Sequence, residues 1–79
     1  MDIAVLKQQL APLTKEICYE LFPHGKIDGT NYRIGGIGGE KGQSLSVQMR
    51  GENAGQWKDF ATGQAGDVLD LIGSVLNLN

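Results

Sequence analysis

The chain has 79 residues, of which 41% are apolar and 20% charged, and its formal net charge is −2. This length predicts one domain over residues 1–79, too small to bury much surface, so its stability is marginal. The sequence shows no signal peptide and no run of about 20 apolar residues, which excludes a membrane span and favours a cytoplasmic protein. The single cysteine, Cys18, excludes an internal disulfide and argues against a thiolate-rich metal site, so we expect it to be a small buried residue.

The first 22 residues predict helix. Apolar residues recur at spacings of three and four and form one stripe of Ile3, Leu6, Leu10, Leu13, Ile17 and Leu21. Pro12 interrupts the run, because proline removes a helical hydrogen bond and clashes with the preceding turn. We therefore expect two helices, about 2–10 and 13–22, or one kinked helix, ended by Pro23 and Gly25.

The middle of the chain predicts antiparallel strands at 30–34, 44–50 and 55–60. In the second segment Leu45, Val47 and Met49 alternate with polar residues, which predicts one buried and one exposed face. Tyr32 and Ile34 share a face in the first segment. Trp57 and Phe60 differ in parity, which predicts a bulge or turn between them.

Residues 67–76 predict a last amphipathic helix, with Asp67 at its start, where a carboxylate meets free N–H groups and the positive end of the helix dipole. The fold class expected is α+β. A small antiparallel sheet of about three strands would be flanked by N-terminal helices and a C-terminal helix. Packing of the N-terminal stripe on the sheet, beside the last helix, would complete a layered core.

The glycine-rich segment GGIGGEKG (35–42) invites a phosphate-binding interpretation. A P-loop needs Ser or Thr after the lysine and a helix after the loop, but here Gly42 follows Lys41 and a strand comes next. A flexible hairpin connection explains the glycines better, with backbone contact to a phosphate as the alternative.

No catalytic set is visible in the sequence. His24 is the only histidine, and its place between Pro23 and Gly25 predicts a surface position. Asp67 and Asp70 share a helix face, which is compatible with a metal, but a helix cap plus a solvated acid is the simpler explanation. We expect a protein that is not an enzyme and that uses no cofactor.

Two segments, YRIGGIGGEKGQSLSV (32–47) and GQWKDFATGQAGDVLDLI (55–72), together resemble the zinc-binding domain of bacterial and phage DNA primases. The family pattern runs Cys-x-x-His, one residue, Glu-Lys, a serine-containing strand, an aromatic strand, Cys-x-x-Cys, and Gly-Asp opening an apolar helix. The resemblance covers about residues 30–78.

The resemblance implies a zinc ribbon that has lost its metal. Gly35 and Gly38 fall where the family has Cys and His, and Asp59 and Thr62 fall where it has the second cysteine pair. Structural zinc needs four donors, mostly thiolate or imidazole, and glycine offers none. No metal site is therefore expected.

The resemblance and the polar strand faces lead to a first hypothesis, a non-catalytic nucleic-acid-binding module of a phage or plasmid replication protein. Single-stranded DNA is the expected ligand, because bases of single strands stack on aromatic side chains. The residues expected to bind it are Tyr32, Arg33, Gln48, Arg50, Trp57 and Lys58. Core packing is the alternative role for Trp57, and a solvated sheet face is the alternative for the basic residues.

The second hypothesis is an interaction or structural module. Its amphipathic helices would dock on a replication partner such as a helicase or a primase core, in the same chain or in another. Under the first hypothesis, the net negative charge predicts that nucleic-acid binding is weak and falls further as salt rises.

Overall fold

The computed structural model describes residues 2–76, and its N-terminal third is helical. Helix α1 covers Ile3–Leu10, a 3₁₀ turn η1 covers Ala11–Leu13, and helix α2 covers Thr14–Leu21. Asp2 begins α1, where its Oδ1 accepts a hydrogen bond from the N–H of Ala4 at 2.9 Å. Pro12 stands in the 3₁₀ turn, so the break that the sequence predicts is confirmed.

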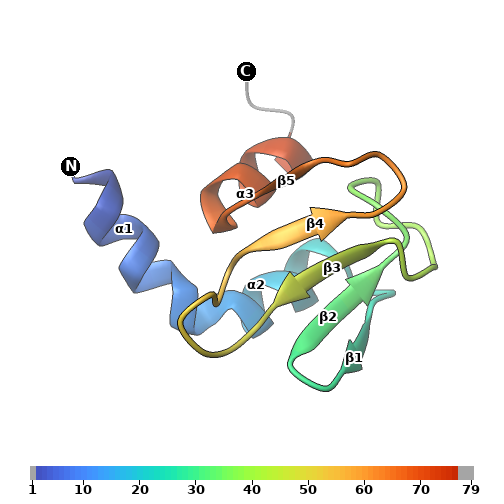
Figure 1. Cartoon of the computed structure of the whole chain (residues 1–79), viewed down its shortest axis with the longest axis horizontal. Coiled ribbons are helices and arrows are strands. Elements are labelled where there is room, and N and C mark those ends of the chain that lie inside the picture. Colours follow the sequence, from blue (N-terminus) through green and yellow to red (C-terminus); the bar gives the residue numbers. More distant parts are fainter. Residues whose placement is uncertain (1, 77–79) are drawn as a thin grey trace.

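Five strands form one antiparallel sheet in simple chain order, β1-β2-β3-β4-β5 (Figure 1). Their bounds are β1 Lys26–Asp28, β2 Asn31–Ile34, β3 Leu45–Gln48, β4 Trp57–Asp59 and β5 Ala65–Gly66. The α+β class is as expected, but the expected strand count of about three is wrong. The three central strands were predicted, whereas the two edge strands are short and are bounded by glycine and turn residues.

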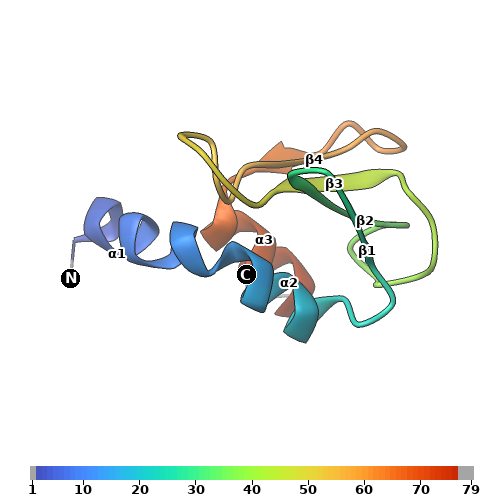
Figure 2. The ribbon, with the colours of Figure 1, turned by 90° about the horizontal axis from the view of Figure 1, so that it is seen from below.

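The helices α2 and α3 (Val68–Leu76) lie on one face of the sheet and leave the other face open (Figure 2). Alternation along the strands sends one set of side chains into the layer between sheet and helices. The core that they form consists of Cys18, Phe22, Tyr32, Ile34, Leu45, Val47, Met49, Trp57 and Leu71. The buried positions predicted for Cys18 and for the apolar residues of the second strand are therefore confirmed.

The N-terminal apolar stripe does not pack on the sheet as expected. No residue of α1 is buried, and the helix extends away from the sheet (Figures 1 and 2). On α2 the buried side chains are Thr14 and Cys18, so the face turned to the core is rotated away from the stripe. Ile3 and Leu13 remain 54% and 49% exposed. The core is thus completed by α2 and α3, and part of the stripe is left on the surface.

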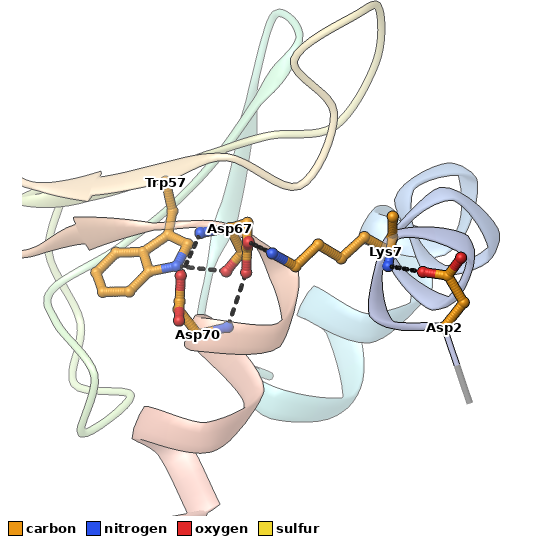
Figure 3. Close-up of polar contacts among 6 residues, drawn as sticks. Asp2, Lys7, Trp57, Asp67 and Asp70 are labelled. Atoms are coloured by element: carbon orange, nitrogen blue, oxygen red, sulfur yellow. Dashed lines mark hydrogen bonds and ion pairs between the residues drawn. The ribbon is translucent and has the colours of Figure 1, made fainter.

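The start of α3 ties three elements together (Figure 3). Asp67 Oδ1 accepts from the N–H of Asp70, and Asp70 Oδ2 accepts from the N–H of Asp67, both at 3.0 Å, which is a reciprocal helix cap. The Lys7 ammonium of α1 lies 2.6 Å from Asp67 Oδ2, and Trp57 of β4 donates its indole N–H to the Asp67 carbonyl. The helix start predicted at Asp67 is confirmed, and the cap explanation of the two acids accounts for their geometry.

Candidate nucleic-acid interface

The strand register aligns one row of polar side chains across the open face. Lys26 pairs with Arg33, Arg33 with Ser46, and Ser46 with Lys58, across four adjacent strands. Directly paired residues of an antiparallel sheet project from the same face. Strands lie about 4.8 Å apart, so the row from Lys26 to Lys58 spans roughly 14 Å. Three of its four members are cationic.

A shallow hollow of about 370 Å³ lies on this face. Its lining combines cations, amides and aromatic rings: Asn31, Arg33, Ser46, Gln48, Asn53, Gln56, Trp57, Lys58 and Phe60. No carboxylate is among the lining residues. Four of the six predicted binding residues thus meet here, namely Arg33, Gln48, Trp57 and Lys58.

The guanidinium of Arg33 lies on the open face beside one acidic residue, Asp28. Its Nε lies 3.0 Å from Asp28 Oδ2, so the two form an ion pair, yet this Nε makes no hydrogen bond that satisfies the geometry. One terminal nitrogen approaches the carbonyl oxygen of Gln43 at 3.5 Å, which is a long contact. Because the Nε is buried, only the terminal nitrogens of the guanidinium are left to receive a phosphate or a base edge.

Phe60 is the aromatic side chain that the hollow offers to a ligand. It is 65% exposed, and the ammonium of Lys58 lies 5.4 Å from its ring centroid. The N–H of Phe60 donates to the Ser44 carbonyl, which continues the in-register pairing of β3 with β4. The bulge or turn predicted between Trp57 and Phe60 is therefore wrong: the strand is regular, and its alternation places Trp57 on the buried side and the Phe60 ring in solvent.

Trp57 and Tyr32 are held inside. Trp57 is 6% exposed, and its Nε1 donates to the carbonyl oxygen of Asp67 at 2.8 Å (Figure 3). Tyr32 has no exposed surface; its hydroxyl donates to the Phe22 carbonyl, and burial raises the pKa of its phenol. The structure thus departs from the expectation that one of these rings is free to stack. Core packing, the alternative for Trp57, describes its position.

Gln48 is the last residue of β3, whereas Arg50 lies two residues beyond it. The amide nitrogen of Gln48 donates to Thr30 Oγ1 at 3.1 Å and to the carbonyl of Arg50 at 3.2 Å, which fixes the side chain and leaves its oxygen as an acceptor. Arg50 is exposed in the β3–β4 loop and does not line the hollow. The Gln48 amide is therefore held in position to accept a hydrogen bond in the hollow, whereas Arg50 adds a positive charge outside the hollow.

The positions that the resemblance assigns to zinc ligands make local hydrogen bonds within their own loops. The N–H of Gly35 donates to the Glu40 carbonyl at 2.7 Å, and a Cβ added at Gly35 would lie 2.6 Å from that same oxygen. Asp59 is buried, and its Oδ1 accepts from the N–H of Ala61. Within residues 2–76, no three His, Cys, Asp or Glu side chains gather as a metal would require. These residues do not fit a zinc ion.

The charges divide between the two sides of the molecule. Residues 23–66, which carry the sheet and its loops, hold five basic and four acidic residues, and one of those acids, Asp59, is buried. The helical segments 2–22 and 67–76 hold two basic residues against five acidic ones. The net negative charge therefore belongs to the helical side, and the open face of the sheet is locally basic.

Comparison with known proteins adds no relative. No family model matches the chain, and no similar curated protein or solved structure was found. Among residues 2–76, no helix combines the length and the apolar character that crossing a bilayer requires.

Sequence reasoning missed Phe60, Lys26 and the amides of Asn31, Asn53 and Gln56 as members of this surface. The sequence contained a signal for Phe60, because residues three apart on a strand lie on opposite faces, and this separates the rings of Trp57 and Phe60. Lys26 carried none, because the strand that aligns it with Arg33 is only three residues long.

Proposed function

We propose that this chain is a non-catalytic module that binds single-stranded nucleic acid, related to the template-binding domain of DNA primases. In this proposal it works within a cytoplasmic replication protein of a phage or plasmid. The observation that carries the proposal is the open sheet face, where Arg33, Lys58 and the exposed ring of Phe60 line one hollow to which no described carboxylate contributes.

The chemistry of this hollow suits an unpaired strand. Stacking of one base on an aromatic side chain contributes about 1–3 kcal/mol and requires a base that is free of its helical neighbours. Lys58 and Arg33 supply charge for phosphates on either side of Ser46, whose small side chain leaves the middle of the row low. Gln48, Asn31 and Gln56 supply hydrogen bonds to base edges or sugars.

The local charge decides how strong this binding can be. Only a few phosphates are neutralised, so affinity is modest and falls as salt rises. Five of the nine acidic residues lie in the helical segments, and none of the described acids lines the open-face hollow, although Asp28 pairs with Arg33 at its β1 side. The net charge of −2 therefore does not describe the charge of this hollow.

The test is a titration of fluorescently labelled oligothymidylate with the full chain, at low and at moderate salt. We expect binding at low salt that weakens as salt increases. Arg33→Gln with Lys58→Gln should abolish most of it, whereas Lys15→Gln, which removes an exposed lysine of α2, should not. Absence of binding by the wild type at low salt would refute the proposal. An unchanged affinity of the double variant would refute the choice of surface.

A second candidate function is supported by the helical side. A groove of about 310 Å³ runs between α2 and α3, lined by the apolar side chains of Leu13, Ile17, Leu21 and Ile72. Among the described residues, the charged side chains that line it are Glu16 and Glu20, which lie one helical turn apart. This combination suits an apolar segment with flanking basic residues, carried by a replication helicase or by a primase core.

This candidate is tested by co-purification with such helicase and primase cores. Leu13→Asp replaces a half-exposed side chain of the groove and should prevent the association without unfolding the chain. Glu16→Lys with Glu20→Lys should weaken it by reversing the charge. If these variants associate as well as the wild type, or if no core associates with the wild type, the groove is not the docking site.

A further inference from the structure

A second basic hollow lies at the β1 edge of the sheet and shares only Lys26 with the cation row described above. It measures about 250 Å³ and is lined by His24, Lys26, Lys41, Gly42 and Gln43. These residues come from the turn after α2, from β1 and from the glycine-rich loop, which lie at the end of the molecule away from α1 (Figures 1 and 2). The hollow therefore joins two segments that are far apart in the sequence.

The described residues that line this hollow include two lysines and a histidine, and no acidic residue. Within the described residues 2–76, neither Lys26 nor Lys41 forms an ion pair. The nearest acids in sequence do not line it: Asp28 pairs with Arg33, and the Glu40 carboxylate lies against Gly36 and Gly38. Two free ammonium groups and an imidazole around one concave space form an environment for an anion.

The glycine-rich loop closes on itself beside this space. Gly42 has a φ of 150°, and a Cβ added there would lie 2.9 Å from the Cα of Gly35. A glycine is therefore needed where the loop closes on itself, and Lys41 and Gln43 flank the hollow with no side chain between them. The glycines of the 35–42 loop, which in the sequence suggested a phosphate contact, thus shape the backbone that carries Lys41.

The hollow is continuous with the open face. A smaller depression of about 210 Å³ lies between the two and is lined by Lys26, Ile27, Asp28, Arg33 and Gln43. It shares Arg33 with the open-face hollow, and Lys26 and Gln43 with the basic hollow. The cation row of Lys58, Arg33 and Lys26 leads from one to the other, so a strand that follows the row reaches Lys41 at its end.

We infer that the hollow of His24, Lys26 and Lys41 is a phosphate site that anchors the nucleic-acid strand as it leaves the open face over the β1 edge. This inference rests on the proposed function. A phosphodiester of the strand and a free phosphate share the same chemistry, so the experiment has one part for each.

The strand is tested with Lys41→Gln, a change confined to the basic hollow, beside Lys58→Gln on the open face and Lys15→Gln as the control on α2. Oligothymidylate affinity is measured over a range of salt concentrations. Each phosphate contact to a single strand contributes about 0.7 to the slope of log K against log salt. We expect Lys41→Gln to weaken binding and to reduce the slope by about 0.7, as Lys58→Gln does, and Lys15→Gln to leave the slope unchanged. Thermal melting checks that all three variants fold.

The free anion is tested by adding inorganic phosphate at constant ionic strength and following the amide NMR signals of Gly42 and Gln43. Shifts in the wild type that disappear in Lys41→Gln, together with the reduced slope, support the anchor. Shifts without a change of slope would overturn it, because the hollow would then take only free phosphate. A normal slope without shifts would also overturn it. If the wild type binds no DNA, the proposed function fails, whereas a failure of the anchor alone leaves Lys58→Gln impaired and Lys41→Gln normal.

Discussion

The indole N–H of Trp57 donates a hydrogen bond to the carbonyl oxygen of Asp67, with 2.8 Å between nitrogen and oxygen (Figure 3). The same carbonyl accepts the first intrahelical bond of α3, from the N–H of Leu71 at 2.9 Å. One oxygen thus joins β4 to the start of the helix that covers it. The ring of the only tryptophan is used for this purpose and is 6% exposed, so it contributes to the core and not to the ligand surface.

Replacing Trp57 by Phe should therefore destabilise the fold and spare binding. The variant loses the hydrogen bond and part of the ring volume, which together cost roughly 1–3 kcal/mol of unfolding free energy. Chemical denaturation measures this loss. Oligothymidylate affinity, measured at a temperature at which the variant is still folded, should equal that of the wild type. A clear loss of affinity would show that Trp57 contacts the ligand.

Replacing Phe60 by Ala should have the opposite result. The side chain is 65% exposed, so its removal changes the unfolding free energy little. It removes the aromatic ring that we propose for stacking, which weakens binding by about 1–3 kcal/mol. Fluorescence anisotropy at low salt measures the affinity, and Phe60→Trp serves as the matched control that retains a ring. Equal affinity of Phe60→Ala and wild type would show that no base stacks on this residue.

The central strands and the helices were predictable because their periodicity is regular and their buried side chains alternate. Leu45 and Val47 illustrate this on β3, and Met49 continues the alternation just after the strand. The edge strands were not predictable, because Lys26–Asp28 is wholly exposed and Ala65–Gly66 has only two residues, so neither carries a burial pattern. Their pairing is decided by neighbouring strands, which local sequence does not encode.

The cationic residues of the binding surface were predictable from the sequence, whereas its exposed aromatic residue, Phe60, was not predicted. Arg33 and Lys58 alternate with buried residues, and this pattern alone placed them on the outer face. Tyr32 and Trp57 were assigned by residue type, although their parity matches that of the buried neighbours Ile34 and Val47. The N-terminal stripe shows a related difficulty, because helical periodicity identifies an apolar face and does not say what covers it.

The ion pair of Lys7 and Asp67 should give stability a defined pH range. Partial burial raises the pKa of the Asp67 carboxyl, but hydrogen bonds from Lys7 and from the N–H of Asp70, with the Lys7 charge, outweigh it and hold that pKa below 3.8. The hydrogen bond to Asp67 raises the pKa of Lys7 above 10.5. A carboxyl with a lowered pKa stabilises the fold above its unfolded value, and a lysine with a raised pKa does so below its own.

Stability from this pair is thus expected between about pH 4 and pH 10, with a decline as the pH falls through the folded pKa of Asp67 or rises through that of Lys7. Thermal melting across this range measures it. Asp67→Asn retains a cap acceptor and should lose most of the acid-side dependence that this carboxyl contributes, whereas Asp67→Ala also loses the cap, at about 1 kcal/mol. Identical acid profiles for Asp67→Asn and wild type would contradict the assignment.

Cys18 should be inert in the folded chain. It has no exposed surface, and burial raises the pKa of its thiol to about 12. Because the thiolate is the reactive form, about one molecule in ten thousand would carry it at pH 8. A colorimetric disulfide reagent should therefore react only after denaturant is added. Rapid reaction in native buffer would place the thiol at the surface.

Chelation should leave the stability of the chain unchanged. Small zinc domains obtain much of their folding free energy from the metal and unfold when it is removed. Here the backbone of Gly35 is hydrogen-bonded to Glu40, where a ligand side chain would need space, and the apolar layer between the sheet and helices α2 and α3 supplies the core. We expect the same melting temperature with and without EDTA, and no stoichiometric zinc in the purified protein by elemental analysis.

A substitution in the core is the matched comparison for chelation. Leu71→Ala should lower the unfolding free energy by about 2–5 kcal/mol, because it leaves a cavity at a fully buried position. Melting of the wild type by EDTA would mean that an ion stabilises the fold in place of these contacts.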